Sequence, residues 1–267
     1  MWERPDLFAL TDEVGNTHWV LLVSINPGGP QGCWLRNIFA RGSYAEFNLQ
    51  DTVTRWIDYG ADNYAGVTWS DIPETDGRAL FIGWMSKCKM LMLFPMKTWR
   101  SATTLPREVV LRRRIKSLNL KFKPVVEIES IVNESKSFSG DALIESPLSL
   151  IEFNLDADKQ DFKLTLSNDN SEKVIISAAE GVLLVDRTAS GITNFSDVFP
   201  AINKMDIRDV QIKNIKVYVD LASIEIFIND GERVMTEIVF PETPYTKVHM
   251  ESSYPTIQGL VNFFYLE

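Results

Sequence analysis

The sequence predicts an all-β protein. Short apolar stretches with alternating polar residues recur along the chain, and clusters of Gly, Pro, Asn and Asp separate them. No stretch has the apolar spacing of an amphipathic helix of three turns. With 267 residues, of which 45% are hydrophobic, the chain can bury a sizeable core as one large domain or two smaller ones.

The first part of the chain contains two clear strand patterns. Residues 19–25 form an apolar run, and residues 26–30, Asn-Pro-Gly-Gly-Pro, should end it in a turn. Residues 79–84 form a second apolar run. All seven tryptophans lie at or before Trp99, and the character of the chain shifts near residue 123, where Pro124 interrupts the mixed segment 118–123. We expect a structural boundary there, with a linker inside residues 112–124.

The second part reads as a series of strands joined by turns. Alternating or apolar runs are found at residues 162–166, 173–177, 182–185, 215–221, 223–228 and 233–240. Between the last two runs, Asn229-Asp230-Gly231 suits the positive φ angles of a tight hairpin. Several short strands at this spacing indicate a β-sandwich.

Charge and composition exclude several classes of function. Lys and Arg number 27 against 36 Asp and Glu, a net charge of −9, and the longest basic run is residues 112–114, so we expect no nucleic-acid partner. No apolar run approaches the roughly 18 residues of a membrane-spanning helix, so we expect no membrane partner. Cys33 and Cys88 allow at most one disulfide, and with His18 and His249 they offer no metal-ligand spacing. Neither a metal nor an organic cofactor is expected.

A set of ordered motifs carries more specific information. They are Trp2-Glu3-Arg4-Pro5-Asp6, Asp58-Tyr59-Gly60, Asn63-Tyr64-Ala65, Gly83-Trp84-Met85-Ser86, Trp99-Arg100-Ser101-Ala102, Thr104-Leu105-Pro106-Arg107-Glu108, Asp186-Arg187-Thr188 and the segment from Asp220 to Glu232. In this order and at these spacings the set resembles glycoside hydrolase family 32, the invertases, inulinases and levanases that cleave β-fructofuranosides.

The resemblance implies the C-terminal portion of a five-bladed β-propeller followed by a β-sandwich. Residues 1–117 would form a partial propeller whose N-terminal blades are absent, and residues 124–267 the sandwich. The family uses three acidic residues in separate blades, and this chain matches only the third, the acid/base Glu at Glu3. The motifs Asn-Asp-Pro-Asn-Gly and Arg-Asp-Pro, which carry the family's nucleophile and its transition-state stabiliser, do not occur.

The implied reaction is hydrolysis of terminal β-fructofuranosidic bonds in sucrose or fructans by a retaining double displacement. Such enzymes need two carboxyl groups roughly 5–5.5 Å apart, so we expect this chain alone to be inactive. One alternative is a non-catalytic carbohydrate-binding or subunit-interaction protein derived from such an enzyme. Another is a split enzyme whose missing blades come from a second polypeptide. Open propeller edges should favour self-association, and the family suggests an extracellular location.

The resemblance also indicates substrate-binding residues. Asp58 and Tyr64 occupy motif positions near the family's funnel, and Trp84 would offer an aromatic platform for a sugar ring. Asp58 has an alternative interpretation, because an Asp before Tyr-Gly often caps its own turn. Arg4 stands where the family usually has Cys; it lies either beside the Glu3 carboxylate or on the opposite face of the strand.

Residues 87–93 depart from the family pattern. After Gly83-Trp84-Met85-Ser86 the family typically continues with Asn-Trp, whereas this chain continues Lys-Cys-Lys-Met-Leu-Met-Leu. One interpretation is a methionine-rich core strand. The other is a pair of compensating frameshifts, because reading the Met-Leu-Met codons one base earlier allows Tyr-Ala-Asn-Val.

Overall fold

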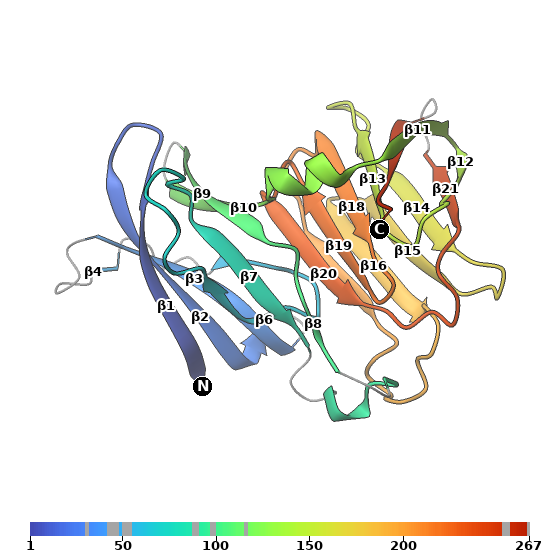
Figure 1. The fold of residues 1–267 in the computed structure, drawn as a ribbon, viewed down its shortest axis with the longest axis horizontal. Coiled ribbons are helices and arrows are strands. Elements are labelled where there is room, and N and C mark those ends of the chain that lie inside the picture. Colours follow the sequence, from blue (N-terminus) through green and yellow to red (C-terminus); the bar gives the residue numbers. More distant parts are fainter. Residues whose placement is uncertain are drawn as a thin grey trace.

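The computed structural model describes residues 1–29, 32–41, 48–49, 55–86, 91–96, 100–114, 117–252 and 257–265. It confirms the all-β prediction. In the described parts of the chain, the only helical elements are two short 3₁₀ turns, η1 (Leu91–Leu93) and η2 (Val126–Ile131). The strands form three antiparallel sheets, which Figure 1 shows in chain order from one end of the molecule to the other.

The first sheet has the order β1-β2-β3-β4, with β5 paired to β3. Its strands are β1 (Trp2–Thr11), β2 (Thr17–Gly29), β3 (Gly32–Arg41), β4 (Asn48–Leu49) and β5 (Arg55–Trp56). The strand expected at residues 19–25 is present. The prediction that a turn begins at residue 26 is wrong, because β2 extends to Gly29. An irregularity between Ile25 and Gly29 shifts the register with β3, and β2 continues until Gly29 pairs with Gly32.

The second sheet has the order β10-β9-β7-β6, with β8 paired to β7. Its strands are β6 (Tyr64–Thr68), β7 (Leu80–Met85), β8 (Ala102–Thr103), β9 (Arg107–Arg114) and β10 (Ser117–Pro124). The strand predicted at residues 79–84 is confirmed as β7. The predicted linker inside residues 112–124 is not found in the described residues, because 112–114 and 117–124 pair as parts of β9 and β10. Leu118, Leu120 and Phe122 alternate with polar residues and are buried, so β10 packs as a strand.

The third sheet contains the twelve remaining strands, in the order β17-β16-β15-β14-β21-β12-β11-β22-β13-β18-β19-β20. They are β11 (Glu134–Ser139), β12 (Asp141–Leu143), β13 (Ser149–Asn154), β14 (Phe162–Ser167), β15 (Lys173–Ala179), β16 (Val182–Ala189), β17 (Ile202–Asp206), β18 (Asn214–Val219), β19 (Ser223–Ile228), β20 (Arg233–Ile238), β21 (Lys247–Glu251) and β22 (Gln258–Phe263). The sheet folds over one core, in which Leu164 and Ile176 of one layer meet Val217 and Ile226 of the other. This is the predicted sandwich (Figure 1).

The sandwich and the second sheet are joined by direct packing. One hydrophobic cluster contains Phe81 and Phe122 from the second sheet together with Phe227 and Val234 from the sandwich. The predicted hairpin turn is present at this boundary. Asn229, Asp230 and Gly231 have positive φ values of 51°, 56° and 82°. A Cβ on Gly231 would lie 2.1 Å from the carbonyl oxygen of Phe122, so only glycine fits this turn.

Candidate active site

Glu3 lies near the start of β1 and is half-buried. It pairs with Ser24 of β2, and the register shifts between Glu3 and Asp6. Arg4, within this irregularity, has a φ of 48° and is exposed. Such a bulge redirects the side chains of the strand that contains it. The predicted acid/base residue therefore occupies an irregular position at the end of the first sheet.

Tyr64 is brought to Glu3 from the second sheet. Its hydroxyl donates a hydrogen bond to Oε2 of Glu3, and its side chain is only 5% exposed. Neighbouring contacts hold β6 against the first sheet: the backbone N–H of Ala65 donates to Oγ of Ser24 at 3.1 Å, and that of Thr68 donates to Oδ2 of Asp6 at 2.6 Å. Two of the residues expected at the site, 61 positions apart in sequence, are thus in contact.

Trp84 lies on the strand next to Tyr64. The two residues are register partners between β6 and β7, and Trp84 also pairs with Thr103 of β8. Its side chain is half-buried. Glu3, Tyr64 and Trp84 thus follow one another across the junction of the first two sheets.

Asp58 lies elsewhere, in the interface with the sandwich, and is only 2% exposed. Its Oδ1 accepts the backbone N–H groups of Gly60 (2.9 Å) and Thr236 (2.8 Å). Its Oδ2 accepts hydrogen bonds from Asn63 (3.0 Å), Arg107 (3.0 Å) and the Thr236 hydroxyl (2.6 Å). The turn-capping interpretation therefore describes this residue. Both carboxylate oxygens are occupied, which leaves none for a sugar hydroxyl in this arrangement.

Asp58 belongs to the Arg107 cluster, which consists of Asp58, Arg107, Glu225 and Thr236. The Arg107 side chain is completely buried and also donates to Oε2 of Glu225 and to the Thr236 hydroxyl, both at 2.7 Å. Burial alone would raise the pKa of the Asp58 carboxyl, but the Arg107 charge and the Thr236 hydrogen bond hold it below its usual value. The cluster joins the second sheet to the sandwich through charged hydrogen bonds.

A second group of buried charges lies nearby, here called the Arg187 cluster: Asp62, Arg187, Asn203 and Glu237. Arg187 donates to Oδ2 of Asp62, which also accepts the backbone N–H of Ile238 at 3.0 Å. Asn203 donates to Oε2 of Glu237 at 2.7 Å. All four side chains are buried.

The segment from Asp58 to Tyr64 is therefore fixed by the sandwich. In addition to the two clusters, the N–H of Tyr59 donates to the carbonyl of Val234, and that of Asp62 to the carbonyl of Thr236. The segment thus lies along β20, the last strand of the third sheet, and leads directly into Tyr64. The sandwich helps to set where the Tyr64 hydroxyl meets Glu3.

The two clusters were not foreseen from the sequence. Arg107, Arg187 and Glu225 all lie in motifs that indicated the family, but nothing in those motifs names a partner. Asp58 and Thr236 are 178 positions apart, and Asp62 and Arg187 are 125 apart. The signal that remains in the sequence is the presence of charged residues inside otherwise apolar or turn-forming motifs.

Residues 87–93 are only partly described. Leu91–Leu93 form η1, in which Met92 is 77% and Leu93 51% exposed. The interpretation as a methionine-rich core strand is therefore wrong for these residues, and the frameshift interpretation stays a prediction. Residues 87–90, which include Cys88, lie outside the described residues, as do Trp99 and the side chain of Cys33.

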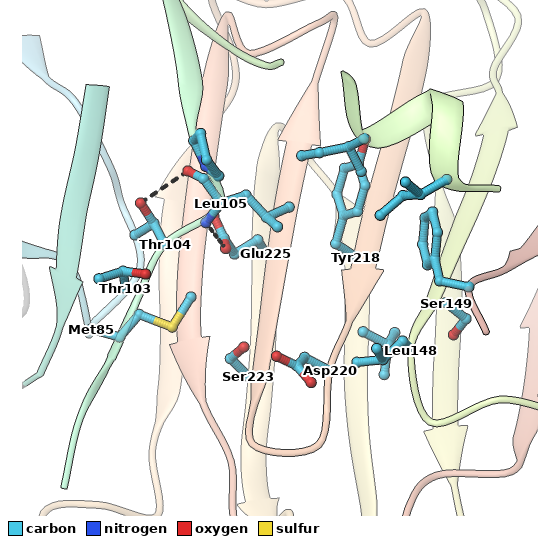
Figure 2. Close-up of a pocket in the computed structure, with 15 residues that line it drawn as sticks. Met85, Thr103, Thr104, Leu105, Leu148, Ser149, Tyr218, Asp220, Ser223 and Glu225 are labelled. Atoms are coloured by element: carbon cyan, nitrogen blue, oxygen red, sulfur yellow. Dashed lines mark hydrogen bonds between the residues drawn. The ribbon is translucent and has the colours of Figure 1, made fainter. Parts of the chain in front are cut away.

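A cavity of about 340 Å³ opens between the second sheet and the sandwich (Figure 2). Its wall includes Leu105 and Glu225, and Figure 2 shows the N–H of Leu105 bonded to the Glu225 carboxylate, at 2.7 Å. Glu3, Tyr64 and Trp84 are not part of its lining.

No group of three or more His, Cys, Asp or Glu side chains in the described ranges could hold a metal ion. No helix among those residues is long and apolar enough to cross a membrane.

Comparison with known proteins identifies the family. The model "Glycosyl hydrolases family 32 N-terminal domain" matches residues 1–124, and "Glycosyl hydrolases family 32 C terminal" matches residues 121–262. The chain belongs to glycoside hydrolase family 32. A levanase of Bacillus subtilis (strain 168) is 33% identical over 91% of this chain, and an extracellular exo-inulinase of Aspergillus awamori is 26% identical over 97% of it.

Solved structures of family 32 enzymes share the fold. The crystal structure of the exo-inulinase from Aspergillus awamori superposes with a TM-score of 0.85 at 23% identity, covering 99% of this chain and 57% of that one. The β-fructofuranosidase from Schwanniomyces occidentalis, complexed with fructosyl-erythritol, gives 0.81 at 21% identity, covering 98% of this chain and 59% of that one. The fold is that of a family 32 propeller portion followed by a sandwich.

The chain is shorter than its relatives. It spans 39% of the length of the Bacillus subtilis levanase and 53% of that of the Aspergillus awamori exo-inulinase.

Proposed function

We propose that this chain supplies the acid/base part of a β-fructofuranosidase active site, with Glu3 as the acid/base residue. The proposed reaction is hydrolysis of terminal β-fructofuranosidic bonds in sucrose or fructans. The observation that carries the proposal is the hydrogen bond from the Tyr64 hydroxyl to Glu3, with Trp84 next to Tyr64. The relatives include proteins named levanase, exo-inulinase and raffinose invertase, which supports a fructoside as substrate.

In a retaining mechanism one carboxylate attacks the anomeric carbon while a second carboxyl protonates the departing oxygen and later activates water. Glu3 takes the second role. Because Tyr64 holds Oε2, the other oxygen, Oε1, is the one that faces the glycosidic oxygen. Trp84 provides an apolar face for a sugar ring, and Tyr64 acts as the residue that orients Glu3. Asp58 contributes to the site indirectly, because it holds the segment that leads to Tyr64 against the sandwich.

We further propose that residues 1–117 are the partial propeller, that residues 124–267 are the sandwich, and that these 267 residues alone hydrolyse nothing. Neither the Asn-Asp-Pro-Asn-Gly nor the Arg-Asp-Pro motif occurs in the sequence. One carboxyl cannot both attack and protonate. Incubation with sucrose, inulin and levan should release no fructose. Release that is abolished by Glu3→Gln would contradict this part of the proposal.

A chimera tests the role of Glu3 itself. The chain would replace the matching part of the Bacillus subtilis levanase, so that the levanase supplies its own N-terminal part. We expect the chimera to release fructose from levan, Glu3→Gln to abolish release, and Tyr64→Phe to reduce it. Glu74→Gln, at an exposed position, is the matched control and should leave activity unchanged. A folded Glu3→Gln chimera with full activity would overturn the assignment.

The non-catalytic alternative is favoured by the same missing motifs. It predicts that levan in the gel slows the migration of the 267-residue chain in affinity electrophoresis, and that the chain releases no fructose from it. We also propose that the chain self-associates through open propeller edges, such as β1 at the edge of the first sheet, where Trp2 is 59% exposed. Sedimentation of a single monomeric species at micromolar concentration would argue against self-association.

A further inference from the structure

The Arg187 cluster contains more acids than bases. Nη1 of Arg187 contacts both carboxylates, since it donates to Oδ2 of Asp62 and lies 3.1 Å from Oε2 of Glu237. The side chains of all three residues are completely buried. One guanidinium can neutralise only one carboxylate. If both acids were ionised, a net negative charge would be buried away from water, at a cost of several kcal/mol.

The hydrogen bonds of Asp62 also indicate that the two acids of the cluster are not both ionised. Its Oδ2 accepts from Arg187 and from the N–H of Ile238, but its Oδ1 is buried and accepts from no donor among the described residues. A buried carboxylate oxygen without a donor is rare and costly. With both acids of the cluster ionised, this unpartnered oxygen would add to the cost of the buried negative charge.

The Arg107 cluster provides an internal comparison. It also pairs two acids with one arginine, but each carboxylate oxygen there has a donor. Oδ1 and Oδ2 of Asp58 accept five hydrogen bonds between them. Oε1 and Oε2 of Glu225 accept from the Leu105 N–H and from Arg107. The Arg107 cluster is therefore fully hydrogen-bonded at its carboxylates, although burial also raises the pKa of Glu225, whereas Asp62 in the Arg187 cluster keeps one oxygen without a donor among the described residues.

We propose that Asp62 and Glu237 share one proton at neutral pH, carried on Glu237, and that this proton helps to hold the propeller portion against the sandwich. Arg187 donates its charge-assisted hydrogen bond to Asp62, whereas it only lies near Glu237. Glu237 is the neutral member because its hydrogen-bond donors are two amides, the Asn203 side chain at 2.7 Å and the Ala61 N–H at 3.3 Å.

The surroundings of Glu237 agree with this assignment. Burial raises the pKa of Glu237 to about 8, and the negative charges of Asp62 and Asp58 add to the effect, whereas Arg187 and the Asn203 hydrogen bond oppose it. The Phe199 ring covers the Arg187 guanidinium at 4.3 Å and helps to keep water away. Because the pKa is raised in the folded state, the stabilising contribution is complete below the ordinary Glu value of about 4.3. It decreases as the pH rises and is lost above about 8.

The proton lies next to the candidate site. Asp62 is two residues before Tyr64, in the segment whose backbone is hydrogen-bonded alongside β20. Loss of the proton at alkaline pH would place a second negative charge against this segment. The consequence is a weaker contact with the sandwich and a less firmly held Tyr64. This inference does not require the chain to be an enzyme.

The test is urea unfolding of the 267-residue chain between pH 5 and pH 9. We expect the wild-type midpoint to fall as the pH rises to about 8. Glu237→Gln mimics the protonated carboxyl, so it should keep a similar midpoint at pH 5 and lose most of this pH dependence. Leu164→Ala, which removes buried apolar volume but no titratable group, is the control and should lower the midpoint at every pH while keeping the wild-type slope. His249, whose pKa is raised by Asp141, is present in all three proteins and cancels in the comparison.

Infrared spectroscopy of the wild-type chain gives a second measurement that needs no variant to fold. A protonated-carboxyl C=O band should be present at pH 7, disappear between pH 7 and pH 9, and be absent in Glu237→Gln. The proposal is overturned if the wild type shows no such band at pH 7. It is also overturned if the stability of Glu237→Gln follows pH in parallel with the wild type.

Discussion

Replacement of Arg107 by methionine is the sharpest test of how the two parts of the molecule are joined. The substitution keeps an unbranched side chain in place but removes the hydrogen bonds to Asp58, Glu225 and Thr236. Two buried carboxylates then lose the cation that they share. Breaking a buried ion pair from one side costs about 3–5 kcal/mol. We expect a loss near the middle of that range, about 4 kcal/mol, which is a large share of the 5–15 kcal/mol typical of folded proteins.

The measurement is denaturant or thermal unfolding at pH 7, where the loss corresponds to a fall in Tm of roughly 10 °C for a chain of this size. Arg78→Met is the control, because Arg78 bonds Asp76 and Glu127 at the surface and should matter much less. The loss in Arg107→Met should grow between pH 5 and pH 8, since the unpaired carboxylates can be neutralised by protons at low pH. A loss no greater than that of Arg78→Met, or one independent of pH, would refute the reasoning.

Two further predictions concern the same interface. Gly231→Ala should cost about 2–3 kcal/mol in unfolding experiments, because its Cβ would lie 2.1 Å from the carbonyl of Phe122 at a positive φ. Gly140→Ala has the same kind of φ but nothing within 4 Å, so it should cost only the backbone strain of about 1 kcal/mol; equal losses would contradict the contact argument. The pKa of Asp58 is lowered in the folded state, so its contribution is present above about pH 4 and is lost as the pH falls through the folded value. Asp58→Asn should therefore flatten the acid side of the stability profile below pH 4, and an unchanged acid side would exclude Asp58 as its source.

The strands could be predicted from the sequence wherever local alternation decides the structure. β14 and β15 lie where the pattern put them, because a half-buried strand repeats its apolar residues every two positions, and β7 and β19 were found as short, mostly apolar runs. A linker was predicted inside residues 112–124, although residues 117–124 alternate in the same way and form β10. Its mixed composition and its proline suggested a break, but burial of Leu118, Leu120 and Phe122 outweighs both.

The candidate site was foreseen only as far as motif resemblance reaches. The structure brings Glu3, Tyr64 and Trp84 together and places Asp58 in the interface with the sandwich, where it caps its own turn; the roles of these residues stay predictions. Its position depends on Thr236, a residue far along the chain that no local pattern links to it. Buried ionic networks are defined by tertiary contacts, so composition and spacing do not reveal which charges meet.

The interface explains how the sandwich bears on the candidate site. The segment from Asp58 to Tyr64 has backbone bonds to β20 and is held at Asp58 by the Arg107 cluster and at Asp62 by the Arg187 cluster. Tyr64 follows directly and meets Glu3. Without the sandwich, Asp58 and Asp62 would lose Thr236 and Arg187, respectively, and the segment would lose the strand along which it lies. The orientation of the Tyr64 hydroxyl toward Glu3 is therefore a property of both parts of the chain, and perturbing either cluster should reach the site through this segment.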